Sequence, residues 1–387
     1  MSASRRIEIA REMRRFARDD WDRLVGAGGS PFLEWDWLAS LEDAGCVSPA
    51  AGWGPQHVAI WDGDELVAAA PAYLKAHSAG EFVFDWGWAE AAARLGVHYY
   101  PKLVAAVPFT PAAGTRLLVA PERTAEREAL AGALAGALEA VAAEGKLSSA
   151  HVLFATSEEV AALEARGWTT RLTMQFQWRN HAYADFDDFL SRLDAKKRAQ
   201  IRRERREVAR RGVTVETVEG DAVTPELLRL MFRYHSGTVE KWRWSDQYLN
   251  EAFYELLADR FRRRLHLVVA RRGGRIIAAA FNVLKGDALW GRYWGCEEEV
   301  PFLHFEVCYY HPIEDCIRRG VGLFSPGAGG EHKYHRAFVP EPQYSAHRVY
   351  DRRLAALVGP AVARERAHVL ATIDALVQRS PLKSKPA

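Results

Sequence analysis

The residues best suited to chemistry gather in one short stretch, which reads GAGGEHKYHR from residue 327 to residue 336. The glycines Gly327, Gly329 and Gly330 come first, and glycine lets the backbone take positive φ and approach a ligand closely. Backbone N–H groups of a glycine-rich turn after a strand can also point at an anion. The titratable residues that follow are Glu331, His332, Lys333, His335 and Arg336. We predict a polar or anionic ligand here, and a plain charged surface loop is the alternative.

These side chains divide into groups that could move a proton and groups that could stabilise a charge. Histidine titrates near neutrality, so His332 or His335 could act as a base, and His347 is a further candidate. Lys333, Arg336 and the backbone N–H groups of residues 327–330 could stabilise a developing negative charge. Ser345 and His347 complete the predicted ligand-binding residues of this stretch.

A metal ion is a second interpretation of the same stretch, because carboxylate and neutral imidazole are zinc ligands. Glu331, His332 and His335 would be the ligands. However, the stretch has no helical HExxH pattern, and it runs into two prolines at positions 340 and 342. We therefore predict no metal site.

A second group of candidates lies in the first half of the chain. Its members are Asp85, Trp86, Tyr99, Tyr100 and Lys102. Aromatic side chains that flank a carboxylate and an ammonium suit a peptide or sugar-like ligand. The alternative for the aromatic residues is packing in the core or in a hairpin.

A basic run marks the segment from residue 186 to residue 211. Apolar residues recur there at three-to-four spacing, which predicts a helix with a narrow buried stripe. Among the basic residues on its other faces are Arg198, Arg202, Arg203, Arg205 and Arg206. Such a helix could hold RNA phosphates or a nucleotide diphosphate, and the alternative is a linker helix whose charges face water.

The elements that must position these residues follow from apolar runs and turn signals. Residues 304–319 predict a helix, and Leu323 begins a short strand that leads into the glycines. Residues 56–60 and 66–74 predict a hairpin, and residues 266–270 and 276–284 predict another. Residues 81–88 predict a third strand after the first hairpin, and residues 359–378 predict a closing helix.

The two hairpins belong to a longer internal match. Residues 63–70 align with 273–280, Lys75 with Lys285, Trp86 with Trp294, and Tyr99 with Tyr309. An ordered series of matches at nearly constant offset indicates an internal duplication. A length of 387 residues also favours two domains. We predict a mixed-sheet α/β protein with two copies of one unit, at residues 1–180 and 181–387, the second opening with the basic linker helix 186–211.

The overall composition is that of a soluble globular protein. Apolar residues make up 49% and charged residues 26%, and the formal net charge of +2 does not point to a class of partner. The four cysteines have no CxxC spacing, and the N-terminus lacks the apolar core of a signal peptide. No apolar run is long enough to predict a membrane span. We therefore expect reduced thiols and a cytoplasmic location.

Three stretches resemble the FemAB-like family of peptidoglycan-biosynthesis-type N-acyltransferases, whose fold is a tandem acetyltransferase-type (GNAT) fold. They are residues 31–42, residues 84–103 with residues 107–118, and residues 327–351. The last is similar to the family's closing Gly-Glu-His-Lys stretch followed by Arg-Gly-Phe-x-Pro, with Ala337 in place of the glycine. The resemblance covers nearly the whole chain.

The resemblance implies that an acyl or aminoacyl group is transferred to an amine to form an amide. That reaction needs a base for the amine, hydrogen-bond donors for the oxyanion and a proton for the leaving group. Lys333 matches the lysine of the closing motif, which the resemblance places near the transferred carbonyl. The implied acceptor is an amine-bearing small molecule or peptide, bound by the residues from Asp85 to Lys102.

The donor is open between aminoacyl-tRNA, which characterised FemAB-type proteins use, and acetyl-CoA or another acyl-CoA. Conventional acetyl-CoA enzymes of this fold carry a glycine-rich loop that holds the pyrophosphate. At the two corresponding places this chain has residues 121–125 (PERTA) and residues 297–299 (EEE), which argues against coenzyme A. A third hypothesis is a non-catalytic RNA- or anion-binding module that uses the basic helix. No further cofactor is predicted, and the oligomeric state is left open.

Overall fold

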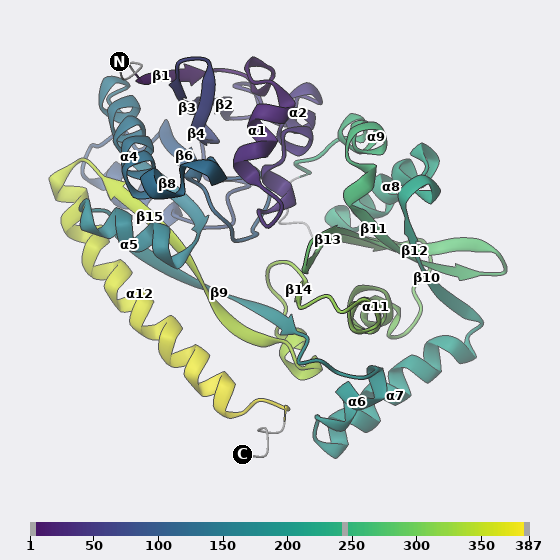
Figure 1. Ribbon diagram of the computed structural model, residues 1–387. Helices are drawn as coiled ribbons and strands as arrows, with labels where there is room; N and C mark the ends of the chain where they lie inside the picture. Colours follow the sequence, from purple (N-terminus) through teal and green to yellow (C-terminus); the bar gives the residue numbers. More distant parts are fainter. Residues whose placement is uncertain (1–4, 242–246, 383–387) are drawn as a thin grey trace. The chain divides into compact units, whose positions relative to one another are not determined.

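The computed structural model describes residues 5–241 and 247–382 and shows two compact units. Unit 1 comprises Met1–Thr173 and Pro342–Leu370, and unit 2 comprises Met174–Glu341 and Ala371–Ala387. The chain passes between the units inside β9 (Thr169–Arg179), β15 (Val339–Val349) and α12 (Arg352–Gln378) (Figure 1). These two units are defined by contacts within the structure. The predicted domains 1–180 and 181–387 are defined by the internal sequence match, and they stay a prediction.

Unit 1 combines two β-sheets with packed helices. Its elements are β1 (Arg5–Ala10), α1 (Arg18–Val25), α2 (Trp35–Asp43), β2 (Trp53–Pro55), β3 (His57–Asp62), β4 (Glu65–Ala70), β5 (Ala72–Lys75), α3 (Trp86–Arg94), β6 (Lys102–Ala105), β7 (Leu118–Val119), α4 (Arg127–Glu144), β8 (Ser149–Ala155) and α5 (Ser157–Ala165). One sheet has the order β1-β3-β4-β7, and the strands β15-β8-β6-β5-β2 are neighbours in the other. Helix α4 packs on β3, β4 and β8 and contributes its alanine and leucine side chains to the core.

Unit 2 is built around one mixed sheet. Its elements are α6 (Phe186–Ser191), α7 (Ala195–Arg210), β10 (Val213–Glu219), α8 (Pro225–Lys241), α9 (Glu251–Arg260), β11 (Leu265–Arg272), β12 (Arg275–Lys285), β13 (Ala288–Cys296), α10 (Leu303–Phe305), the π-helical turn η6 (Glu306–Tyr310), α11 (His311–Arg319), β14 (Leu323–Ser325) and the 3-10 helix η7 (Glu331–Arg336). The strand order is β10-β11-β12-β13-β14-β9. Figure 1 shows α8 and α9 on one side of these strands and α11 on the other.

The predicted mixed α/β architecture is confirmed, and several predicted elements have different bounds. Both hairpins are present, with Gly63 and Gly273 at positive φ in their turns. The basic segment forms two helices, because Asp194 accepts a hydrogen bond from the Lys197 N–H and caps a new helix. The closing helix begins at Arg352, earlier than predicted, because Asp351 accepts from the first N–H groups of α12.

The predicted strand at residues 81–88 is wrong. Phe82 has positive φ, and helix α3 begins at Trp86. The alternation of apolar residues fails as a strand signal because Glu81 and Asp85 both turn inward to one buried ammonium, that of Lys102. Tertiary polar contacts therefore override the local pattern.

The internal match holds in the hairpins and ends after them. Lys75 and Lys285 are each the last residue of a strand, and both are buried. Beyond them the pairs differ, since Trp86 lies in a helix and Trp294 in a strand. Tyr99 lies between α3 and β6, whereas Tyr309 lies in the helical segment that follows β13, so the tyrosines also occupy different kinds of element.

Within the described residues, no helix combines the length and the apolar character that crossing a membrane requires.

Candidate functional site

Strands β13 and β14 of unit 2 separate where the glycine stretch begins. They are paired in parallel from Ala288 to Trp290 and from Leu323 to Ser325. Strand β13 then continues to Cys296, whereas the segment after β14 turns at Pro326 into the glycines. This opening between the two strands is called the fork below.

A small cavity of about 70 Å³ lies at the fork. Its wall includes Asn282, Gly291, Arg292, His304, Cys308 and Tyr309, with Pro326 at the side of the glycine stretch. A water molecule occupies about 30 Å³ in the liquid. The cavity therefore fits a group of only a few heavy atoms.

The π-helical turn η6 forms one wall of this cavity. Such turns often occur at functional sites, because the extra residue redirects the neighbouring side chains. In η6 the adjacent residues Tyr309 and Tyr310 have separate partners. The Tyr309 hydroxyl lies 2.8 Å from His332 Nε2, whereas the Tyr310 hydroxyl donates to the Glu204 carboxylate.

Lys333 brings a buried positive charge to this region. Its side chain is 3% exposed, and Nζ donates to the carbonyl oxygens of Gly327 (2.7 Å) and Ala328 (3.2 Å). No carboxylate pairs with it in the part of the chain that the structure describes. Burial lowers the pKa of Lys333 to about 8, although the Cys308 thiol acts in the opposite direction. The ammonium is thus still charged at neutral pH, and two bonds leave its third N–H for a ligand.

The charge of Lys333 reaches the cavity wall. Burial, together with the neighbouring His332, Arg336 and Lys333, lowers the pKa of His304 to about 3. Burial raises the pKa of the Cys308 thiol, and the positive charge of Lys333 opposes that rise. Both wall residues are therefore neutral at physiological pH.

The histidines of the stretch lie in different environments. His332 is half-buried, and burial together with Lys333 and Arg336 lowers its pKa, so its Nε2 can accept a proton from the Tyr309 hydroxyl. His335 is exposed and contacts the Tyr334 ring. The side chain of Glu331 lies outside what the structure describes. His332 is a predicted base that contacts two residues of the cavity wall, Tyr309 and His304.

Arg336 anchors the stretch to helix α7. It is 4% exposed, with Nη2 donating to Glu204 Oε2 (2.9 Å) and Nε donating to the Tyr310 hydroxyl (2.8 Å). Its Nη1 donates to the His332 carbonyl oxygen at 2.9 Å. Because these contacts occupy the guanidinium, Arg336 holds His332 and Lys333 in place, and its predicted role as a direct ligand donor stays a prediction.

The backbone of the stretch uses positive φ repeatedly. Gly327, Gly329 and Gly330 have φ of 84°, 70° and 85°. A Cβ atom on Gly327 would lie 3.0 Å from the Gly291 carbonyl oxygen, so this glycine allows the close approach to β13. Ala337 also lies in the left-handed region, at φ 68°, where alanine costs about 1 kcal/mol. The family's glycine at this step therefore has a clear conformational reason.

The first-half candidates converge in unit 1 on a second buried charge, Lys102. Its Nζ donates to Asp85 Oδ2 (2.5 Å), Glu81 Oε2 (2.9 Å) and Ser78 Oγ (3.0 Å). Tyr99 donates to Asp85 at 2.5 Å, and the Tyr100 hydroxyl lies 2.8 Å from Ser78 Oγ. The structure thus brings together four of the five predicted residues, in a cluster with mutual partners.

Charges in this cluster are strongly coupled. Burial raises the pKa of Glu81 to about 7, and Lys102 counteracts it. Burial would also raise the pKa of Asp85, but Lys102 and His151 bring it down to about 2. Nearby Lys75 lies 3.8 Å from the centre of the Trp53 ring, and burial lowers its pKa to about 7.

Trp86 is the exception among the first-half candidates. It is 57% exposed and stacks on Phe84, with ring centroids 4.6 Å apart. An exposed aromatic pair can bind the face of a ring. Its place beside Asp85 in the sequence keeps it among the predicted ligand contacts.

Ser345 and His347 belong to unit 1, not to the unit of Lys333. Ser345 accepts from the Phe154 N–H, and His347 Nδ1 lies 2.6 Å from His151 Nδ1. Both histidines are buried; burial lowers the pKa of His151 to about 3 and that of His347 well below its usual range. The predicted stretch therefore splits, with residues 327–336 in one compact unit and residues 345 and 347 in the other.

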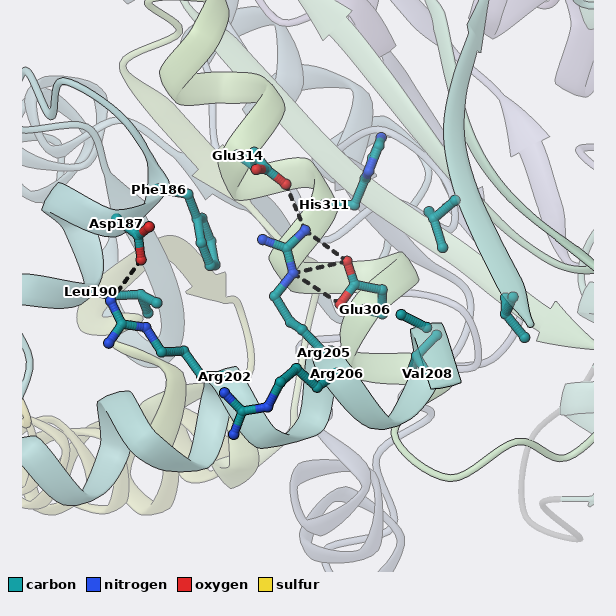
Figure 2. A pocket seen from close by; sticks show the side chains of 13 residues that line it. Phe186, Asp187, Leu190, Arg202, Arg205, Arg206, Val208, Glu306, His311 and Glu314 are labelled. Carbon is teal, nitrogen blue, oxygen red and sulfur yellow. Dashed lines mark hydrogen bonds and ion pairs between the residues drawn. The ribbon is translucent and has the colours of Figure 1, made fainter. Parts of the chain in front are cut away.

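The basic helix lines an open groove of about 610 Å³ in unit 2 (Figure 2). Figure 2 shows the Arg205 guanidinium between the carboxylates of Glu306 (3.1 Å) and Glu314 (2.6 Å). Arg202 pairs with Asp187 at 2.7 Å, and Arg198 donates to carbonyl groups at the end of α6. Arg203 and Arg206 are exposed and have no partner within residues 5–241 and 247–382. The five arginines therefore do not form one uniform phosphate-binding face.

The loop expected to exclude coenzyme A has compensated charges. Glu298 pairs with Arg272 and Arg275, and Glu299 pairs with Lys241. At the start of the following helix, the N–H groups of Phe305 and Glu306 bond to the Phe302 carbonyl. Repulsion of a phosphate is weaker than the sequence indicates, but the helix start offers few free donors.

Among the described residues, no group of three or more histidine, cysteine, aspartate or glutamate side chains is arranged to hold a metal ion.

Comparison with protein families identifies the class. The FemAB-like family, described as peptidoglycan biosynthesis/recognition, matches residues 12–384, and this chain belongs to it. No curated protein matches the chain in sequence.

Solved structures show the same fold at low sequence identity. FemX superposes with a TM-score of 0.56 and 11% identity, over 89% of this chain and 98% of that one. The C-terminal domain of a putative lysylphosphatidylglycerol synthetase from Agrobacterium fabrum superposes with a TM-score of 0.53 and 14% identity, over 89% of this chain and 96% of that one. A tandem GNAT protein from the clavulanic acid biosynthesis pathway superposes with a TM-score of 0.45 and 12% identity, over 89% of this chain and 98% of that one. The superposition with FemX shows that this chain has the same fold.

Several residues at the site escaped the sequence analysis. Tyr309 and His304 lie on a helix that was predicted as a support only. Glu204 was hidden in a run of arginines, although it is 2% exposed and binds Arg336. A lone acid on the buried stripe of a basic helix was the available signal, since a buried carboxylate needs a cationic partner.

Proposed function

We propose that this protein is an N-acyltransferase that transfers an acyl or aminoacyl group to an amine and forms an amide at the fork of unit 2. The observation that carries the proposal is Lys333, a buried ammonium without a carboxylate partner in the described chain, beside a cavity in a FemAB-like protein.

Lys333 would stabilise the oxyanion of the tetrahedral intermediate with its third N–H. A donor of this kind is worth about 100-fold to 1000-fold in turnover in other acyl-transfer enzymes. The two carbonyl bonds and the anchoring of Arg336 hold the ammonium in one place. His332 would take up the proton that the amine must lose, because its lowered pKa keeps the imidazole neutral.

The volume of the cavity favours a small acyl group. A space of about 70 Å³ admits a few heavy atoms beyond the carbonyl carbon. The acceptor would be an amine-bearing small molecule or peptide.

The favoured donor is aminoacyl-tRNA, as the FemAB-like resemblance implies. The exposed Arg203 and Arg206 of α7 would contact its phosphates. Acyl-CoA is the second candidate. The salt bridges of Glu298 weaken the repulsion of a phosphate, but the glycine-rich loop of conventional acetyl-CoA enzymes is still missing from the sequence.

A donor test decides between these possibilities. Purified protein is given a radiolabelled mixture of aminoacyl-tRNAs or radiolabelled acetyl-CoA, together with a panel of amine acceptors, and amide product is counted. Transfer from tRNA that weakens with salt and in the Arg203→Ala/Arg206→Ala variant supports the favoured donor. Transfer from acetyl-CoA alone replaces the donor, and tRNA binding without any transfer would favour the non-catalytic RNA-binding hypothesis.

A further inference from the structure

The Tyr309–His332 pair of unit 2 has a geometry that suits proton transfer. Tyr309 lines the cavity at the fork and is 3% exposed. Its hydroxyl lies 2.8 Å from His332 Nε2, within the range of a normal hydrogen bond. A group that touches the cavity is thereby connected to a neutral imidazole on the glycine stretch.

The surroundings of the pair define its protonation state. Burial raises the pKa of Tyr309, and burial with two neighbouring cations lowers that of His332. The pair is therefore a neutral phenol and a neutral imidazole, and in the tautomer with the proton on Nδ1 the phenol donates to Nε2. Around the pair lie the rings of His304, Phe305 and Phe338, which limit the access of water.

We propose that the Tyr309 hydroxyl contacts the reacting amine and acts with His332 as a proton relay between the amine and the leaving group. This inference rests on the proposed acyl transfer and adds to it a catalytic residue from the wall of the cavity.

The relay accounts for each proton of the reaction. The amine nitrogen attacks the acyl carbonyl, a C–N bond forms, and the carbonyl electron pair moves to the oxygen beside Lys333. Tyr309 takes one proton from the attacking nitrogen as it gives its own proton to His332 Nε2. When the intermediate collapses, the bond to the leaving oxygen or sulfur breaks. His332 then returns its proton to Tyr309, which protonates the leaving group. Both residues end in their starting states.

The adjacent Tyr310 provides a matched control. It is also a buried tyrosine of η6, but its hydroxyl donates to Glu204 and accepts from Arg336 instead of contacting His332. Tyr310→Phe removes a hydroxyl of the same kind from the anchor, whereas Tyr309→Phe removes the relay.

The test measures single-turnover transfer as a function of pH for the full-length wild type, Tyr309→Phe, His332→Gln, the double variant and Tyr310→Phe. The relay predicts a loss of about 100-fold or more in the rate at saturating substrate for Tyr309→Phe, with KM changed less than about 3-fold. Since the two residues act as a unit, the double variant should be no slower than His332→Gln. Both single variants should also lose the acid limb of the wild-type profile.

Two results would overturn the relay. One is a Tyr309→Phe protein that keeps more than about a third of the wild-type rate with the same pH profile. The other is a loss in Tyr310→Phe as large as that in Tyr309→Phe, which would mean that either hydroxyl merely supports the fold. Absence of any transfer by the wild type with every donor would instead contradict the proposed function, so the two failures are distinguishable.

Discussion

Lys102 of unit 1 and Lys333 of unit 2 are both buried among polar groups, and these two lysines are held in opposite ways. In unit 1, Lys102 is fully buried and donates to two carboxylates and a serine hydroxyl. In unit 2, Lys333 is buried almost as completely, but both of its acceptors are backbone carbonyl groups. The charge of Lys102 is compensated by neighbouring carboxylates, whereas the charge of Lys333 has no carboxylate partner among the described residues.

The difference indicates two roles for the same residue type. A buried ammonium with ionised partners is a structural charge, because removing it leaves carboxylates buried without compensation. An ammonium that is held only by dipoles can respond to a negative charge that develops on a substrate. Mutation of Lys102 should therefore change stability, and mutation of Lys333 should change turnover.

Lys102→Met should break unit 1 most severely. Glu81 and Asp85 would lose the ammonium that bonds to both of them, at a loss of about 3–5 kcal/mol in the free energy of unfolding. Chemical denaturation followed by circular dichroism measures this loss. Combining Lys102→Met with Asp85→Asn should recover part of it, and a Lys102→Met protein as stable as the wild type would end the distinction between the two lysines.

Glu204→Gln tests whether Arg336 is an anchor. The buried carboxylate accepts from Arg336, Tyr310 and Gln200, and its neutralisation should lower the free energy of unfolding by about 2–3 kcal/mol. The matched control is Glu207→Gln on the same helix, which pairs with the exposed residues Arg210 and Arg211. Equal losses in both variants would show that Arg336 has no special dependence on Glu204.

The pH dependence of turnover sharpens the account of Lys333. Its pKa is lowered to about 8, so the charged form, and the oxyanion donor with it, is lost as the pH rises through 8. Turnover should fall about 20-fold between pH 7.5 and pH 9.5, relative to Lys333→Arg, whose guanidinium stays charged. If Lys333→Arg is active and shows the same alkaline decline, another group causes it.

The His151–His347 pair predicts a smaller effect, on the stability of unit 1 in acid. Burial depresses both pKa values below those of the unfolded chain, so the stabilisation is present above about pH 6.5 and is lost as the pH falls toward 3. The free energy of unfolding should decrease by about 1.4 kcal/mol per pH unit for each proton taken up. A His151→Gln/His347→Gln protein should show a flatter dependence in the same titration, and an unchanged slope would contradict the assignment.

Much of the fold and part of the site could be predicted from the sequence. Glycine turns between apolar strands identified both hairpins, and the Gly-Glu-His-Lys stretch identified the loop that carries Lys333. These features are local, since a positive φ or an alternating pattern is written in neighbouring residues.

The remaining features depend on contacts between distant residues. Tyr309 meets His332 across 23 positions, and Glu204 meets Arg336 across 132. The direction of Tyr309 also follows from a π-helical turn, which has no pattern of its own in the sequence. The division of the closing stretch between two compact units was equally hidden, because it falls inside β15, which is one continuous strand.

The central claim is that the uncompensated ammonium of Lys333 does chemistry, and the most direct measurement is the single-turnover acyl-transfer rate of Lys333→Met together with its melting temperature. The account predicts a rate at least about 100-fold lower, with a melting temperature close to that of the wild type. A rate that is unchanged, or that falls only as far as the protein unfolds, would contradict it.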